Sequence, residues 1–485
     1  MPFAALRWLG PGGVVCGLAF VALALPTLGS AVDDAWISGR YAAHLVAGHG
    51  LVFNVDGPSV EGFSNPLWTM WLALGLVLTG EVHPFMTWTG LGFGLLLLPC
   101  ATGLAATLAG RWHPATLLAP ATLALSPHVV VACTNGLETA QWLCLLVASA
   151  WATFAAEGPW RVLTAVLCVA LALCRPEGMA VGAWFVAFDA LRHRRREVAV
   201  GFVGALVVLE AWRLAFYGAW VPHPVLAKTT DVSFVENLRY VGRDGVLWPW
   251  VGWSLLGAAL VLPRRMEGLG LVLVAVGLVG VAFQVELWMP ASRLLLPAGV
   301  FSACAMAGVA ASPGRGAVPA GLSLVVGLGL LHLSPLPSTV REDDHKHSVD
   351  APWASLQAAA FLAERLPPGS TVAIRDAGAF AYGIGPLHRV IETHPLGLTG
   401  PPEAWPDPEL IVTTVRQPNT TWLLYPEDRV WLEGTSVPYV HLGKIKQHHR
   451  RYYDVWAHPD LGLPPLPPHL VVPDTRPVTP SGRVR

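Results

Sequence analysis

The feature that most constrains this chain is a long series of apolar segments separated by short polar turns. It extends from Leu9 to Pro335 in a sequence of 485 residues. A helix that crosses the hydrocarbon core of a bilayer needs about 20 mostly apolar residues, because no water is present there to satisfy exposed backbone groups. The pattern therefore predicts an all-α polytopic membrane part with about eleven spans.

We expect these spans near residues 9–30, 84–109, 114–133, 137–156, 160–174, 178–191, 197–217, 246–262, 268–288, 293–312 and 317–334.

The distribution of charged residues divides the chain in two. They make up 13% of the whole sequence, against about 25% in an ordinary soluble domain. Residues 336–485 have the composition of a soluble domain, with a strand signal at 370–374, a turn at Gly378 and a proline-rich end. The sequence thus predicts a transmembrane domain over 1–335, with a long loop at 31–83, followed by a small α/β domain outside the membrane over 336–485.

Basic residues lie in one set of turns between the apolar segments. These turns contain Arg111, Arg161, Arg192, Arg194, Arg195, Arg196, Arg264, Arg265 and Arg315. All of them fall on one side if the short apolar stretch 66–78 is an interfacial helix and not a span. The positive-inside rule makes that side cytoplasmic, so the loop 31–83 and the tail domain are expected on the non-cytoplasmic side.

Polar residues gather at the opposite ends of the predicted helices. They are Asp33, Asp34, Arg40, Tyr41, Glu61, Ser64, Asn65, Glu138, Arg175, Glu177, His223, Lys228, Glu286 and Arg293. Each has a plain structural explanation when taken alone: a solvated helix cap, a local ion pair, a loop histidine, an interfacial anchor or a snorkelling arginine. Their convergence favours a site at the membrane surface, because transporters more often place such groups near the midplane.

These residue types fit the transfer of a sugar from a lipid phosphate to a hydroxyl group. A carboxylate can take the proton of the acceptor. A cationic side chain or a metal ion can stabilise the departing phosphate. The net charge of −1 says nothing about a nucleic-acid partner, but the sequence has no basic patch with interleaved aromatic residues, so none is expected.

Longer motifs make the interpretation more specific. Residues 33–54 read DDAWISGRYAAHLVAGHGLVFN, and residues 60–68 read VEGFSNPLW. Shorter motifs follow, namely NGLET at 135–139, CRPEG at 174–178, PHPVLAK at 222–228, RLLLP at 293–297 and RDAGAFAY at 375–382. Together they resemble the GT-C superfamily of polyprenyl-phosphate-dependent glycosyltransferases. Within it, the motifs are most similar to bacterial cell-wall arabinofuranosyltransferases and their uncharacterised relatives.

The resemblance implies roles for individual residues. Asp33 would be the catalytic base with Asp34 beside it. Lys228, Arg293 and Arg175 would contact the donor phosphate. Glu61, Asn65, Arg40, Tyr41 and Glu138 would line the cavity or contact the acceptor, and Glu61 with His223 would be candidate ligands of a divalent metal ion, the one cofactor expected.

The resemblance also implies partners and a location. The donor would be a polyprenyl-phosphate-linked sugar, and the acceptor an envelope glycan, a lipid or a protein. The chain would lie in the bacterial inner membrane among its lipids, with the active site and the C-terminal domain on the non-cytoplasmic side.

Two other functions stay open from the sequence. The chain could be a transporter or flippase for lipid-linked sugars, or an inactive scaffold. The position of Asp33 and Asp34 in a predicted exterior loop favours the enzyme. The sugar is not determined, and arabinofuranose and mannose are both candidates.

Overall fold

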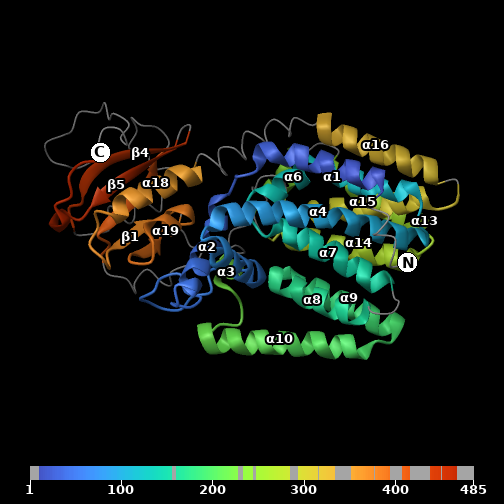
Figure 1. Ribbon diagram of the computed structural model, residues 1–485, viewed down its shortest axis with the longest axis horizontal. Helices are drawn as coiled ribbons and strands as arrows, with labels where there is room; N and C mark the ends of the chain where they lie inside the picture. Colours follow the sequence, from blue (N-terminus) through green and yellow to red (C-terminus); the bar gives the residue numbers. More distant parts are fainter. Residues whose placement is uncertain are drawn as a thin grey trace.

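The structure is a computed structural model of the whole chain. It describes residues 10–155, 160–227, 233–243, 247–284, 293–314, 316–333, 351–375, 377–393, 407–415, 437–448 and 451–466. The chain is mostly helical and has one small sheet (Figure 1). The sheet and two helices form an α/β part that lies at one end of a large helical part.

The helical part runs from the first described residues to Leu333. Its helices are α1 (Pro11–Ala24), α2 (Asp33–Val46), α3 (Pro66–Thr79), α4 (Val82–Ala109), α5 (Leu118–Ala124), α6 (Pro127–Thr134), α7 (Thr139–Ala155), α8 (Trp160–Cys174), α9 (Glu177–His193), α10 (Arg196–Tyr217), α11 (His223–Ala227), α12 (Phe234–Arg243), α13 (Leu247–Val261), α14 (Arg265–Ala282), α15 (Leu296–Ala311) and α16 (Ala317–Leu333).

Most of these helices lie where the apolar segments predict them, but the segment 114–133 is not one helix. A short 3₁₀ turn (Pro114–Leu117) leads into α5, and α6 then continues at an angle of 62° to that first stretch. Pro127 starts α6, and the Ser126 hydroxyl accepts a bond from the Val129 N–H at 3.5 Å. Proline cannot donate a backbone hydrogen bond, and serine is a good helix cap, so a new helix begins here.

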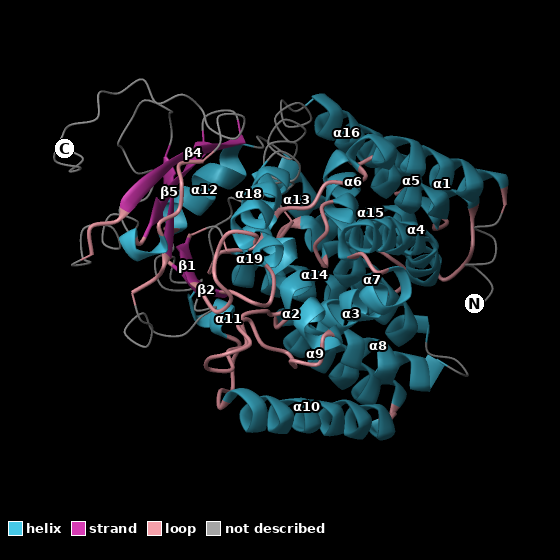
Figure 2. Ribbon diagram, turned by 60° about the vertical axis from the view of Figure 1, so that its left-hand side comes forward, coloured by secondary structure: helices cyan, strands magenta, loops and turns pink. Residues whose placement is uncertain are grey.

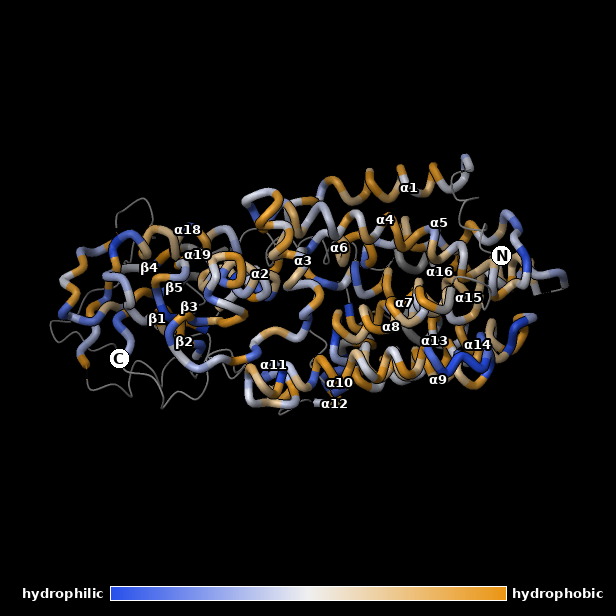
Figure 3. Tube along the Cα trace, turned by 60° about the horizontal axis from the view of Figure 1, so that its bottom comes forward, coloured by the Kyte–Doolittle hydropathy of each residue, from blue (hydrophilic) through white to orange (hydrophobic). Residues whose placement is uncertain are grey.

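Three described helices are long and apolar enough to cross a membrane: α4, α10 and α14. The bent pair α5–α6 would make a fourth if it counts as one span. The tube in Figure 3 shows that apolar residues dominate the helical part, whereas hydrophilic residues are frequent in the α/β part.

Small residues bring the central helices close together. A Cβ atom at Gly103 of α4 would lie 2.4 Å from the Trp151 ring of α7, and one at Gly90 would lie 2.5 Å from the Cys133 carbonyl oxygen of α6. Close approach through glycine is typical of helices that pack within a membrane. At the edge of the bundle, α10 exposes Val200, Val203, Val207 and Val208, as a lipid-facing helix would (Figure 1).

The α/β part contains a five-stranded sheet (Figure 2). Its elements are α18 (Ala351–Ala363), β1 (Thr371–Ile374), α19 (Ala379–Ile384), β2 (Arg389–Glu392), β3 (Leu410–Val415), β4 (Val440–His448) and β5 (Arg451–Ala457). The strand order is β2-β1-β3-β5-β4; β1 is parallel to β2 and β3, and β5 is antiparallel to β3 and β4. The predicted strand at 370–374 and the turn at Gly378 into a helix are confirmed.

The two parts share a hydrophobic core. Tyr41 of α2 and Phe53 and Phe63 of the loop that follows it belong to the same buried cluster as Phe380 of α19. The segment between α1 and α3 therefore packs against the α/β part, although α18 begins about 300 residues later in the sequence.

Candidate active site

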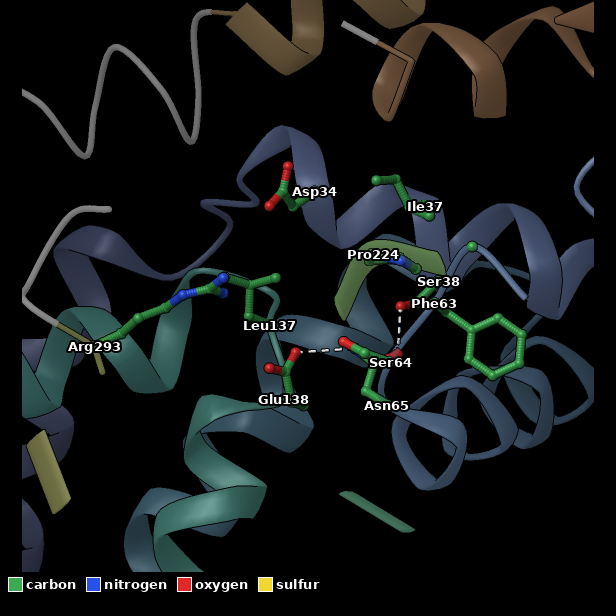
Figure 4. A pocket seen from close by; sticks show the side chains of 11 residues that line it. Asp34, Ile37, Ser38, Phe63, Ser64, Asn65, Leu137, Glu138, Pro224 and Arg293 are labelled. Carbon is green, nitrogen blue, oxygen red and sulfur yellow. Dashed lines mark hydrogen bonds between the residues drawn. The ribbon is translucent and has the colours of Figure 1, made fainter. Parts of the chain in front are cut away.

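A small open pocket of about 50 Å³ lies between α2, the loop before α3, and the start of α7. Its lining residues are Asp34, Ile37, Ser38, Gly62, Phe63, Ser64, Asn65, Leu137, Glu138, Pro224 and Arg293. Figure 4 shows Asp34, Glu138 and Arg293 around this space, each from a different segment of the chain. Four of the predicted site residues, Asp34, Asn65, Glu138 and Arg293, are thus brought together.

Glu138 is held in place at one wall of the pocket. Its Oε1 accepts a bond from Arg175 Nη1 at 2.6 Å, and its Oε2 accepts one from Asn65 Nδ2 at 2.9 Å. The Asn65 oxygen in turn accepts bonds from the hydroxyls of Ser38 (2.9 Å) and Thr69 (3.2 Å). A buried carboxylate with these partners is fixed in one rotamer, because losing any of them would leave a buried charge or dipole unsatisfied.

Arg175 lies between two acids at the break between α8 and α9. Besides the bond to Glu138, its Nε donates to Glu177 Oε1 at 2.6 Å. The two carboxylates compensate its charge, as a largely buried cation requires. Arg175 does not line the pocket, so the structure places it behind Glu138, and its predicted contact with the donor phosphate stays a prediction.

Arg293 is the cation that faces the pocket. It lies close enough to Asp34 and Glu138 to be attracted by both carboxylates. Its Nε atom is buried and has no hydrogen-bond partner among the residues that the structure describes. A buried guanidinium N–H without a partner is unusual in a folded protein. The pocket therefore offers a donor that suits an anionic ligand.

The structure separates the two adjacent aspartates. Asp34 lines the pocket, whereas the Asp33 carboxylate accepts bonds from the backbone N–H groups of Gly378 (3.0 Å) and Ala379 (2.9 Å) in the α/β part. Successive side chains on a helix point about 100° apart, so two neighbours in the first turn of α2 reach different surroundings. The predicted role of Asp33 as the base stays a prediction; of the two adjacent aspartates, Asp34 is the one that lines the pocket, together with Glu138.

Arg40 and Tyr41 lie away from the pocket that they are predicted to line. Both are fully buried. The Arg40 guanidinium bonds to backbone carbonyls on both sides of the junction with the α/β part, and the Tyr41 hydroxyl donates to the Val60 carbonyl at 2.7 Å and accepts from the Gly62 N–H at 2.9 Å. Burial raises the pKa of Tyr41 well above its usual value. Through these bonds, both residues fix the loop between α2 and α3.

The proposed metal ligands do not fit a metal site. Glu61 is fully buried, and its two carboxylate oxygens accept bonds from Arg213 of α10 at 2.6 and 3.3 Å. Burial raises the pKa of Glu61, and the bond from Arg213 opposes this shift. His223 meets Glu61 through the backbone, its N–H donating to the Glu61 carbonyl at 3.1 Å. Across the described ranges no group of three or more His, Cys, Asp or Glu residues could hold a metal ion.

One predicted residue lies outside the described part of the chain, and two residues at or near the site were not predicted. Lys228 lies outside the described residues. Ser38 and Arg213 were not predicted, yet Ser38 lines the pocket and Arg213 neutralises Glu61. A signal for each is present in the sequence. Ser38 follows Asp34 by four residues and so shares its helix face, and Arg213, like Glu210, is a charged residue within the mainly apolar α10.

Comparisons with known proteins give matches at the level of structure alone. No family model matches the chain, and no curated protein matches its sequence. The structure is similar to ArnT from Cupriavidus metallidurans bound to undecaprenyl phosphate, with a TM-score of 0.59 and 15% identity over 92% of this chain and 98% of that one.

Two further solved structures share the fold. The oligosaccharyltransferase of Archaeoglobus fulgidus in its apo form gives a TM-score of 0.58 and 11% identity over 88% of this chain and 71% of that one; it is also known in complex with Zn and sulfate. The mycobacterial arabinofuranosyltransferase AftD gives a TM-score of 0.53 and 16% identity over 93% of this chain. The match covers 40% of the AftD chain. The GT-C fold that the sequence motifs implied is confirmed.

Proposed function

We propose that this chain is a membrane glycosyltransferase that moves a sugar from a polyprenyl-phosphate donor to a hydroxyl group of an acceptor. The observation that carries the proposal is the pocket, which a carboxylate from α2 and the partly exposed Arg293 both line; the buried Nε of this arginine has no hydrogen-bond partner among the described residues. The fold adds support, because ArnT with the same fold has been solved with undecaprenyl phosphate.

The reaction that suits this pocket is a displacement at the anomeric carbon. The acceptor oxygen forms a bond to that carbon while the bond from the carbon to the phosphate oxygen breaks, and the bonding electrons leave with the phosphate. Asp34 takes the proton of the acceptor hydroxyl. Arg293 binds the departing phosphate and stabilises its growing charge.

The bonded network behind the pocket would hold these groups in place. Glu138 is fixed by Arg175 and Asn65, and its negative charge attracts Arg293. We assign Glu138 and Asn65 the task of orienting Arg293 and the acceptor, since rigid surroundings keep reacting groups in a productive geometry. Lys228 follows the pocket residue Pro224 by four positions, and its contact with the donor phosphate is part of the proposal.

The orientation in the membrane is also proposed. Arg111, after α4, donates to the Ala311 carbonyl at the end of α15 at 2.8 Å, and Arg264 donates to the Phe154 carbonyl near the end of α7 at 3.2 Å. These basic turns therefore lie at the ends of α7 and α15 opposite to the pocket. The positive-inside rule makes that end cytoplasmic, which supports a non-cytoplasmic pocket and α/β part in the inner membrane. About eleven spans, as the apolar segments predict, are part of the proposal.

The sugar and the acceptor are chosen by similarity. AftD, whose fold the chain shares, is named an arabinofuranosyltransferase, so arabinofuranose is the first donor sugar to test, and mannose the second. The acceptor would be an envelope glycan, a lipid or a protein.

A transfer assay tests the function directly. Purified full-length protein in detergent receives radiolabelled polyprenyl-phosphate sugars and a membrane-extract acceptor. The variant Asp34→Asn is measured beside the control Asp56→Asn, whose side chain is 74% exposed in the loop after α2. We expect one donor to be consumed, with a loss of about 10²- to 10⁴-fold in Asp34→Asn and no loss in the control. Donor binding without turnover in every protein would favour a transporter or a scaffold.

A further inference from the structure

The helix α2 has two faces that serve two different parts of the molecule. Asp34, Ile37 and Ser38 line the pocket. Asp33 and Arg40, which are two helical turns apart, instead contact α19 of the α/β part. This division follows the helical repeat, because residues separated by seven positions lie on one face.

Asp33 and Arg40 hold opposite ends of α19. The Asp33 carboxylate accepts the N–H groups of Gly378 and Ala379 at the start of this six-residue helix. The Arg40 Nη1 donates to the carbonyls of Ala381 and Gly385 (3.2 Å for the latter) near its end. The acid lies at the positive end of the helix dipole and the base at the negative end, so both charges also suit the helix electrostatically.

Arg40 uses its full set of donors at this junction. In addition to α19, Nη2 donates to the His388 carbonyl at 3.2 Å and to Asn54 Oδ1 at 3.3 Å, and Nε donates to the Phe53 carbonyl at 2.6 Å. Guanidinium carries five N–H donors, and each has an acceptor here. Because the side chain is almost completely buried, the separation of the two parts would leave a buried cation without partners.

Asn54 extends the sheet with its side chain. Its Oδ1 accepts the Val390 N–H at 2.9 Å, and its Nδ2 donates to the Val390 carbonyl at 2.9 Å. The amide thus pairs with β2 as a neighbouring strand would. An aromatic contact completes the junction, since the rings of Trp36 and Tyr382 have centroids 5.0 Å apart.

We propose that Asp33, Arg40 and Asn54 form a clamp that fixes the α/β part on α2 and thereby positions Asp34 in the pocket. Asp33 is then a positioning residue, and the α/β part supports the active site directly. The role of Asp34 in this inference rests on the proposed function. The clamp itself can be tested without turnover, by amide hydrogen exchange.

Two variants of the full-length protein separate positioning from catalysis. Asp33→Asn places an amide NH₂ group against one of the two N–H donors of α19. We expect amide hydrogen exchange in a peptide covering 377–388 to become about tenfold faster. Turnover falls, yet the residual activity keeps the acidic limb of the pH profile. Asp34→Asn is expected to leave the exchange unchanged and to remove the acidic limb.

A glycine variant tests the clamp without replacing Asp33. A Cβ atom at Gly378 would lie 2.0 Å from the Asp33 carbonyl oxygen, so Gly378→Ala must displace α19. We expect it to reproduce both the faster exchange and the retained acidic limb, and the double variant Asp33→Asn/Gly378→Ala to be no worse than the more severe single variant. Gly257→Ala is the matched control, because nothing lies within 4 Å of that position.

The outcomes distinguish the two proposals. Unchanged exchange in Asp33→Asn, together with loss of the acidic limb, would make Asp33 the base and overturn the clamp. Unchanged exchange in both Asp33→Asn and Gly378→Ala would overturn it as well, whatever the activity. If no donor is turned over by the native protein, the proposed function fails, and faster exchange in both variants would still support the clamp.

Discussion

At the scale of single residues, the pocket depends on how a few charges are compensated. Glu138 and Arg175 neutralise each other at 2.6 Å, and Arg213 neutralises Glu61. Arg293 differs from these pairs, because its Nε atom has no partner in the described part of the chain. Compensated pairs build the walls of a site, whereas a buried donor without a partner is left for a ligand.

Replacement of Arg293 should therefore affect ligand binding more than folding. We expect Arg293→Gln to weaken binding of undecaprenyl phosphate by about 10- to 100-fold, the range given by the loss of a hydrogen bond to a charged group. The affinity of Arg293→Lys should lie between those of Arg293→Gln and the native protein, since lysine keeps the charge but not the planar set of donors. Equilibrium binding in detergent measures this. Arg196→Gln, an exposed position at the start of α10, is the control, and equal affinity in Arg293→Gln and the native protein would contradict the assignment.

A buried histidine beside the clamp predicts a dependence of stability on pH. His44 is 2% exposed, and its Nδ1 lies 2.9 Å from the Val52 carbonyl oxygen. Burial, with the nearby charge of Arg40, lowers the pKa of His44 from 6.5 to about 4. The unfolded chain therefore binds a proton at a higher pH than the native chain does. Neutral, buried His44 therefore contributes to the free energy of unfolding. This contribution is complete above about pH 6.5 and is lost as the pH falls towards 4; the loss is at most about 3 kcal/mol.

Thermal unfolding of native protein and of His44→Gln between pH 8 and 4 measures that loss. The native midpoint should fall more steeply than the midpoint of the variant below about pH 6.5. The comparison is needed because burial also lowers the pKa of His388, which acts in the same direction. Parallel curves for the two proteins would show that His44 is not the group responsible.

At the scale of elements, glycines decide how closely the central helices pack. Gly103 of α4 lies against the ring of Trp151, at 2.4 Å from a hypothetical Cβ, whereas nothing lies within 4 Å of Gly92 in the same helix. The faces of one helix can also have different neighbours. In α2, one face lines the pocket and another contacts α19.

The two glycines of α4 give a matched test of this packing. Gly103→Ala should lower the thermal unfolding midpoint, with a loss of about 1–3 kcal/mol from overpacking against Trp151. Gly92→Ala should bring no such loss. A similar effect of the two substitutions would mean that α4 and α7 are not as close at this point as the structure places them.

At the scale of the whole molecule, the α/β part and the segment between α1 and α3 act as one body. They share a buried cluster that includes Tyr41, Phe53 and Phe380, and the clamp residues Asp33, Arg40 and Asn54 join them by hydrogen bonds. A junction with both a common apolar core and buried polar bonds is not expected to open freely.

Cleavage between the two parts should therefore leave them together. A protease site inserted within 334–350, between α16 and α18, can be cut in the purified protein. We expect the two fragments to elute as one species in detergent, because the shared core and the clamp remain. The same cleavage in Arg40→Gln should release a larger share of the C-terminal fragment, since several buried acceptors lose their donor. Complete separation of the native fragments would contradict the shared core.

The sequence alone determined the features that depend on local pattern. A backbone in an apolar medium must satisfy its own hydrogen bonds, so the long apolar segments were predictable as helices. The run of mostly β-branched residues at 371–374 predicted the short strand. The motifs also predicted Asn65, Glu138 and Arg293 as site residues, and the structure places all three at one pocket. The break at Pro127 was readable in principle, because proline ends backbone hydrogen bonding locally.

Only the tertiary structure decided how the motif residues divide their tasks. Asp33 and Asp34 are adjacent and chemically identical, but one meets backbone groups 345 residues away and the other meets the pocket. Arg40 is likewise committed to carbonyls that lie up to 348 residues later. The direction of a side chain follows from the local helix, whereas its partner follows from how distant segments dock, and no local pattern encodes that contact.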